Sequence, residues 1–251
     1  MRISVALLSC ALAAPIAGCG WQTGYPPPAV PRPADIHDFT TLYSQNCAAC
    51  HGSAGENGPA TDLANPEYEA LIDDATLHKW IAAGMAGTQM PAFGKENGGM
   101  LTDQQVGEIV TGMRKQWARP DAFAGAQPPP YAQAHAGDAH RGQQVYQARC
   151  AMCHTHSRQE VTSPIYLGLV NDQSLRSIII AGSPDIGQPD WRHDSAGSKP
   201  APPLSEQDVD DIIAYLAAVR SSEPAYAGNG AGPPPGPSEG VKREPTAPGP
   251  Q

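Results

Sequence analysis

The chain has 251 residues, a formal net charge of −9 at pH 7, 27 prolines and 26 glycines. The acidic balance argues against a nucleic-acid ligand, because affinity for nucleic acid depends on Lys and Arg that neutralise phosphates. The length allows one or two domains, and the prolines and glycines concentrate in segments that cannot form a core, so the folded part is shorter than the chain.

The N-terminus has the pattern of an export signal. A mostly apolar run follows Arg2 and ends at Gly18, and it is too short for a stable membrane span. Residues 16–19, Ile-Ala-Gly-Cys, resemble a bacterial lipobox, in which the cysteine becomes the first residue and carries lipid. We therefore expect a signal peptide at residues 1–18, lipidation of Cys19 and a location on the periplasmic side of a bacterial membrane. The alternative is an ordinary signal peptide that leaves an unmodified thiol.

A proline-rich tether is expected at residues 19–34, followed by a helix that starts at Asp35. This helix runs into a C-x-x-C-H string formed by Cys47, Cys50 and His51. The string is repeated about a hundred residues later as Cys150, Cys153 and His154. The spacing is typical of covalent c-type haem, with each thiol on a vinyl group and the histidine on the iron. One copy alone would also suit a disulfide, half a zinc site or a redox pair. Two copies in an exported chain favour two c-type haems.

The rest of the first half follows a regular order. Residues 52–65 are rich in turn formers, and a short helix with an acidic start is predicted to begin near Asp74 and end at Gly84. An irregular segment, 87–94, contains Met90. A capping box at residues 102–105 then opens an amphipathic helix that reaches Trp117.

The second half repeats this order. Tyr146 stands four residues before Cys150, as Tyr43 stands four residues before Cys47. Residues 171–182 parallel 73–84, and 204–209 parallel 101–106. We therefore expect duplicated domains at 35–117 and 138–220, a proline-rich linker at 118–137 and a disordered Pro/Gly-rich tail at 221–251.

Each half resembles a class I cytochrome c domain, in which a helix, the C-x-x-C-H string, a loop, a helix, a ligand loop and a closing helix follow in that order. The resemblance covers residues 35–117 and 138–220 and includes the string Met90-Pro91-Ala92-Phe93. It implies an all-α fold of two tandem cytochrome c domains, in which the first and closing helices of each domain cross. The whole chain resembles a lipid-anchored di-haem cytochrome c.

The resemblance also implies axial ligands for the first haem. A methionine from the irregular loop completes the iron, and Met90 fits that position better than its competitor Met85, because Pro91 follows it. The carbonyl of Pro59 would accept from the Nδ1–H of His51, and Pro164 would do the same for His154. The remaining methionines of this half, Met100 and Met113, are expected to be packing residues.

The second domain departs from the family pattern, because Gln188 stands where the first domain has Met90 and no methionine follows Met152. Gln188 is then a weak ligand or merely lines an open site. His193 or His156 would instead supply a second imidazole, and the sixth position would otherwise hold water or nothing. His193 is the better histidine candidate because it lies near the ligand loop, and it also fits a solvated loop histidine.

These patterns predict a one-electron relay rather than an enzyme in its own right. The chain would pass electrons between redox partners, namely a membrane quinol-oxidising complex and a soluble cytochrome or terminal oxidase. Two alternatives use an open second haem: a di-haem peroxidase-like enzyme, or a sensor that binds NO or CO.

Overall fold

The structure, a computed structural model, describes residues 30–154, 160–193 and 201–222. The expected signal peptide, Cys19, His156 and nearly all of the expected tail lie outside the described residues. The described residues form helices and turns, with isolated β-bridges and no strand, as the all-α prediction requires. Within these ranges, no helix combines the length and apolar character needed to cross a membrane.

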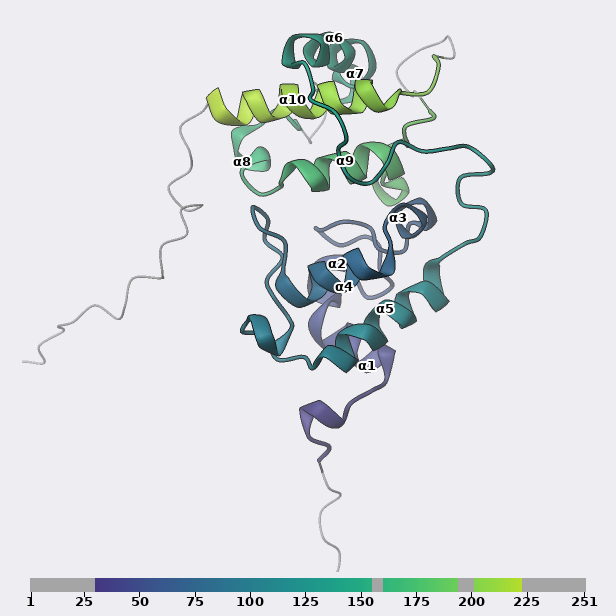
Figure 1. Cartoon of the computed structure of the whole chain (residues 1–251), viewed down its shortest axis with the longest axis vertical. Coiled ribbons are helices and arrows are strands. Elements are labelled where there is room, and N and C mark those ends of the chain that lie inside the picture. Colours follow the sequence, from purple (N-terminus) through teal and green to yellow (C-terminus); the bar gives the residue numbers. More distant parts are fainter. Residues whose placement is uncertain (1–29, 155–159, 194–200, 223–251) are drawn as a thin grey trace, which may run out of the picture.

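The two halves form separate helical domains that stack on one another (Figure 1). The first contains η1 (Pro33–Asp35), α1 (Phe39–Asn46), α2 (Ala48–His51), α3 (Pro66–Leu71), α4 (Asp74–Ala83), η2 (Lys95–Asn97) and α5 (Asp103–Trp117). The second contains α6 (Ala139–Arg149), α7 (Ala151–His154), α8 (Pro164–Leu167), α9 (Asp172–Ala181), η3 (Pro184–Ile186) and α10 (Glu206–Ser222). The predicted helix from Asp74 to Gly84 and the capping box of α5 are both confirmed.

The predicted start of the first helix at Asp35 is wrong, because α1 begins at Phe39. Asp38 caps it, with Oδ2 accepting from the backbone N–H of Thr41 at 2.8 Å. The backbone before Phe39 does not continue the helix, since the carbonyls of Pro33 and Ile36 accept from the buried side-chain amide of Gln105 in α5. A capping side chain and a tertiary contact therefore set this boundary, and the acidic residue at 35 does not.

Each domain has its own apolar core, built where the first and closing helices meet. In the first domain α1 packs on α5, and Leu42, Ile109 and Met113 are almost fully buried. In the second domain α6 packs on α10, and Tyr146, Val209 and Ile212 fill the corresponding space. The expectation that Met100 is a packing residue is wrong, because the residue is 77% exposed.

The segment between α5 and α6 packs against both domains. The phenol oxygen of Tyr131 accepts from the indole N–H of Trp80 in α4 at 2.8 Å, and its backbone carbonyl accepts from Gln173 in α9. The carbonyl of Pro130 accepts from Arg176, a fully buried guanidinium that also pairs with Asp210 in α10. The segment therefore contacts both domains in addition to connecting α5 to α6.

Candidate functional site: two haem sites

Each C-x-x-C-H string forms a single helical turn directly after the first helix of its domain. Cys47 bonds back to the carbonyl of Tyr43 and its own carbonyl accepts from His51, at 2.8 and 3.0 Å. The turn that begins at Cys150 repeats these two bonds at 2.8 and 3.1 Å. This turn brings both thiols and the histidine together, as two thioether bonds and one iron ligand from a single short segment require.

The imidazole of His51 is held by a backbone carbonyl, although not by the expected one. Its Nδ1 lies 2.8 Å from the carbonyl oxygen of Thr61, so the prediction of Pro59 is wrong by two residues. A carbonyl can only accept, so Nδ1 carries the proton and Nε2 keeps a lone pair that is available to a metal ion. Burial lowers the pKa of His51, while the bond to Thr61 opposes that effect. In the second domain Pro164 opens α8.

The two ligand loops have the same backbone geometry. Gly84 and Gly182 end their helices with φ of 73° in each case, and a Cβ on either would lie 2.9 Å or 2.8 Å from the carbonyl oxygen of Met90 or Gln188. The next residue in each loop then donates its N–H to the same carbonyl, Met85 to Met90 at 3.1 Å and Ser183 to Gln188 at 2.9 Å. Met90 and Gln188 therefore occupy equivalent positions in the two domains.

Met85 and Met90 point to different neighbours. The side chain of Met90 is half-buried against the core of its own domain. The sulfur of Met85 instead accepts from the hydroxyl of Ser174, in α9 of the other domain, at 3.2 Å. Of the two methionines, Met85 is therefore engaged at the domain interface.

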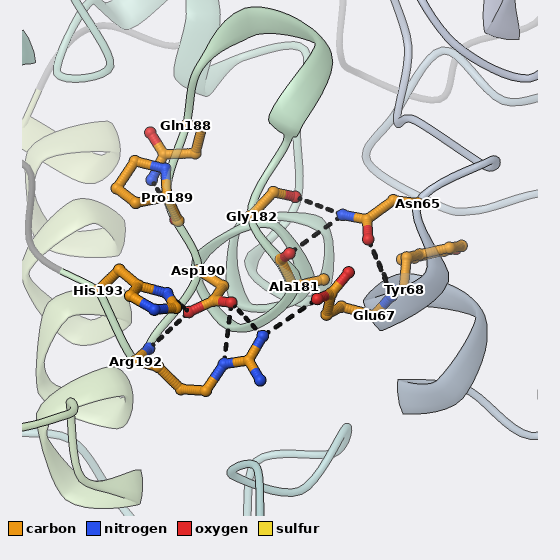
Figure 2. A network of polar contacts seen from close by, with 10 residues as sticks. All are labelled: Asn65, Glu67, Tyr68, Ala181, Gly182, Gln188, Pro189, Asp190, Arg192 and His193. Carbon is orange, nitrogen blue, oxygen red and sulfur yellow. Dashed lines mark hydrogen bonds and ion pairs between the residues drawn. The ribbon is translucent and has the colours of Figure 1, made fainter. Parts of the chain in front are cut away.

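Gln188 faces the histidine of the second C-x-x-C-H string. Its Oε1 lies 3.1 Å from Nε2 of His154, and its amide nitrogen donates to the carbonyl of Pro189, which orients the oxygen toward the imidazole. His193 is differently placed: its ring is 69% exposed and its Nδ1 lies 2.9 Å from Asp190 (Figure 2). Of the described side chains considered for the sixth position, the amide is the one opposite His154.

The chemistry of both sites fits a covalent haem. None of the four cysteines of the strings forms a disulfide. Burial raises the pKa of Cys47 to about 11, with the neighbouring Cys50 as a smaller cause. In the second core, the buried indole N–H of Trp191 has no hydrogen-bond partner among the described residues, so a haem carboxylate would suit this donor.

Comparisons with known proteins agree with this geometry. A family model described as cytochrome c matches residues 139–220, and one described as cytochrome c oxidase, cbb3-type, subunit III matches residues 34–111. The chain is 26% identical over 137 residues to the cbb3-type cytochrome c oxidase subunit CcoP of Azospirillum brasilense. That match spans 47% of this chain and 39% of the relative.

Among solved structures, the chain is similar to a reducing HAO-like protein complex of Kuenenia stuttgartiensis, with a TM-score of 0.43 and 15% identity. The alignment covers 76% of this chain and 99% of that one. The family models together cover both helical domains, and each domain contains one C-x-x-C-H turn. The chain therefore belongs to the cytochrome c family, with two tandem cytochrome c domains and a covalently bound c-type haem in each.

Proposed function

We propose that this protein relays single electrons between redox partners on the periplasmic side of a bacterial membrane, to which Cys19 anchors it through lipid. The observation that carries the proposal is the contact between the two ligand loops and the opposite domains, which joins two haem sites in one unit. When bound, each haem iron supplies the one-electron change. The chain's own residues position the iron's ligands and set how the two sites differ.

In this proposal four cysteines hold the haems and the first site has two protein ligands. Cys47 and Cys50, then Cys150 and Cys153, form the thioether bonds. His51 is fixed by Thr61 and supplies Nε2, and Met90 supplies a soft thioether, which favours the ferrous state. Met85 is not assigned as the iron ligand because its sulfur accepts a hydrogen bond from Ser174.

The second site has His154 and, opposite it, the amide oxygen of Gln188. An amide oxygen is a harder donor than a thioether and stabilises ferrous iron less, so the second haem should have the lower potential. His193 is a weaker candidate, because Asp190 holds its ring nitrogen and the ring is exposed. The potential difference would drive electrons from the second haem to the first.

The remaining parts of the proposal concern the ends of the chain and its partners. Residues 1–18 would be the signal peptide, 19–34 the tether, 35–117 and 138–220 the two domains, 118–137 the linker and 221–251 the tail. The match to a cbb3-type oxidase subunit supports a terminal oxidase, rather than a soluble cytochrome, as one redox partner, and a membrane quinol-oxidising complex would be the other. If the anchor is correct, Cys19→Ser releases the holoprotein into the soluble periplasmic fraction.

A redox titration followed by optical spectroscopy tests the ligand assignment. Met90→Ala should lower the first potential, abolish the methionine-to-iron charge-transfer band and leave the second potential unchanged. Gln188→Met should raise the second potential and add a second such band. Equal shifts of both potentials in either variant would contradict the assignment of one ligand loop to each haem.

Gln188 also favours a second candidate function, because an amide is easily displaced from iron. A weakly held sixth position suits a peroxidase-like enzyme or a sensor of NO or CO. Electron paramagnetic resonance of the oxidised holoprotein, with CO added after reduction, separates the cases. Two low-spin haems that bind no CO support the relay alone, whereas one high-spin haem that binds CO supports the second candidate.

A further inference from the structure

The two domains meet through the segments that carry the sixth-position residues. Helix α3 of the first domain packs on α9 of the second, and α9 leads directly into the loop that contains Gln188. In the other direction, the start of α9 lies against the loop that contains Met85 and Met90. The ligand loops therefore form part of the interface, together with α3 and α9.

Asn65 is the central contact on one side of this interface. Its side chain is almost fully buried, and its Oδ1 caps α3 by accepting from the backbone N–H of Glu67 at 2.9 Å. Its amide nitrogen crosses the interface and donates to the carbonyls of Ala181 and Gly182, at 3.0 and 3.2 Å (Figure 2). The last carbonyls of a helix lack partners within the helix, so α9 obtains them from the other domain.

Asn65 therefore contacts Gly182, the residue at which α9 ends and the loop that contains Gln188 begins. Gly182 approaches the loop so closely that a Cβ would lie 2.8 Å from the carbonyl oxygen of Gln188 and 2.9 Å from the nitrogen of Asp190. The backbone N–H of Ser183 donates to the Gln188 carbonyl, and the Ser183 carbonyl accepts from the N–H of Gln188. A displacement of the Gly182 carbonyl would move Gln188 relative to His154.

A second contact from the first domain holds the far end of the same loop. Glu67 accepts from Nη2 of Arg192 at 3.0 Å, and this guanidinium also binds Asp190 (Figure 2). Burial acts to raise the pKa of Asp190, but the bonds from Arg192 and His193 outweigh it and lower the pKa overall. In the middle of the loop, the backbone N–H of Asn57 donates to Asp185 at 3.1 Å.

The reverse arrangement holds the Met90 loop. Asn171 caps α9 through Oδ1, which accepts from the N–H of Ser174 at 2.8 Å, and its amide nitrogen donates to the carbonyl of Ala86 at 2.8 Å. The hydroxyl of Ser174 donates a hydrogen bond to the sulfur of Met85, and the backbone N–H of Met85 donates to the carbonyl of Met90. Thus an asparagine that caps a helix in one domain also binds the ligand loop of the other domain, in both directions.

We propose that each sixth-position loop is positioned by the opposite domain: Asn65 and Glu67 position the Gln188 loop, and Asn171 positions the Met90 loop. The inference rests on the proposed assignment of Met90 and Gln188 to the two haems. It makes the ligation of each haem dependent on an amide from the other domain. The two haem sites are then coupled through the protein as well as through electron exchange.

Two isosteric variants test whether each sixth-position loop is positioned by the opposite domain. Asn65→Asp and Asn171→Asp keep the helix caps, because Asp and Asn are equivalent N-caps, but remove the amide donor and put a carboxylate beside backbone carbonyls. Asn65→Asp should change the electron paramagnetic resonance signal of the second haem and its ligand-exchange equilibrium, by about two- to tenfold for one or two lost hydrogen bonds. Asn171→Asp should weaken the methionine band of the first haem by a similar factor.

The matched control is Asp73→Asn, at the repeat position that corresponds to Asn171. Asp73 is exposed and caps α4 through Thr76, and its side chain makes no described hydrogen bond to the other domain. This variant should leave both haem signals unchanged. If Asn65→Asp prevents folding, Glu67→Gln tests the same loop from a less buried residue and should also alter the second haem alone.

The crossed pattern is the supporting result. Signals that change in the variant's own domain, in both domains equally or in neither domain would overturn the proposal. Met90→Ala in the same series distinguishes a failure of the ligand assignment from a failure of the positioning proposal. If it abolishes the methionine band while the crossed pattern is missing, the ligand assignment stands and the positioning proposal fails. If the band survives Met90→Ala, the ligand assignment itself fails.

Discussion

At the scale of single residues, the two sites differ mainly in one side chain on a shared backbone. Gln188 stands where Met90 stands, after a glycine with the same φ and with the same hydrogen bond to its carbonyl. Because the backbone is conserved between the repeats, the difference in donor atom is not offset by a shift in the loop. In the proposed ligand assignment, the exchange of thioether for amide would act directly at the sixth position of the second haem.

A buried carboxyl at the interface should make stability depend on pH. Burial raises the pKa of Asp62 from 3.8 to about 6, and the next cause is the negative charge of Asp185 in the other domain. One oxygen of Asp62 has no hydrogen-bond partner among the described residues. Because the pKa is higher in the folded state, the contribution is fully present below pH 3.8 and is lost as pH rises through about 6.

Asp62→Asn should remove this dependence. We expect the Tm of the variant to exceed that of the wild type increasingly between pH 4 and pH 7, because only the wild type acquires the buried charge. Thermal unfolding of both holoproteins across this pH range measures the difference. Two curves that run parallel would show that Asp62 does not titrate in this range.

At the scale of elements, the arginines that brace the closing helices are repeated between the domains. Arg114 in α5 donates to Glu69 and Asp74, and Arg220 in α10 donates to Asp172 and to the carbonyl of Leu167. Each arginine ties the end of its closing helix to the helices that precede the ligand loop. The closing helix is therefore fixed to the helices that precede the ligand loop.

The close approach at the end of α9 should be sensitive to a single methyl group. Gly182→Ala forces an alanine into a conformation that favours glycine and puts its Cβ against the carbonyl of Gln188. Gly187→Ala is the matched control, because φ there is 79° and nothing lies within 4 Å of the added Cβ. The control should cost about 1–2 kcal/mol of unfolding free energy from backbone strain.

Gly182→Ala should cost more than its control, because the clash adds to the strain, and it should also perturb the second haem. Denaturant unfolding gives the free energies, and electron paramagnetic resonance reports the haem. Equal losses of stability in the two variants, with the haem signals intact, would mean that the loop accommodates the methyl group without moving Gln188.

At the scale of the whole molecule, the two domains and the segment between them form one connected structure. Tyr131 bonds to α4 through its hydroxyl and to α9 through its backbone carbonyl, and Arg176 connects Pro130 to α10. Asn65 and Asn171 add direct contacts. A fixed relation between the haem sites suits electron transfer between them.

Tyr131→Phe tests the contribution of the linker to this structure. The variant leaves the indole N–H of Trp80 without its partner, which should cost about 1 kcal/mol of unfolding free energy and speed hydrogen exchange in the linker. Tyr215→Phe is the control, because the Tyr215 hydroxyl has no described hydrogen bond and its ring packs on Tyr146. Similar exchange rates in both variants would contradict the role of Tyr131.

The sequence by itself determined the features that depend on local spacing. These are the two C-x-x-C-H turns, the start of α4 near Asp74, the capping box of α5, the glycine that ends each ligand-loop helix and the duplication that predicts two helical domains. Each follows from residues within a few positions of one another, where hydrogen bonding and allowed backbone angles leave few alternatives. Spacing also aligned Gln188 with Met90.

Only the tertiary structure decided which distant groups meet. It brings Thr61 rather than Pro59 to His51, Gln188 rather than His193 to His154, and Met85 to the other domain. Asn65 and its partner Ala181 are 116 residues apart, so no local pattern joins them. Asn65 and Asn171 each cap a helix through the side-chain oxygen, but the amide nitrogen of each finds its partner only because the two domains pack together.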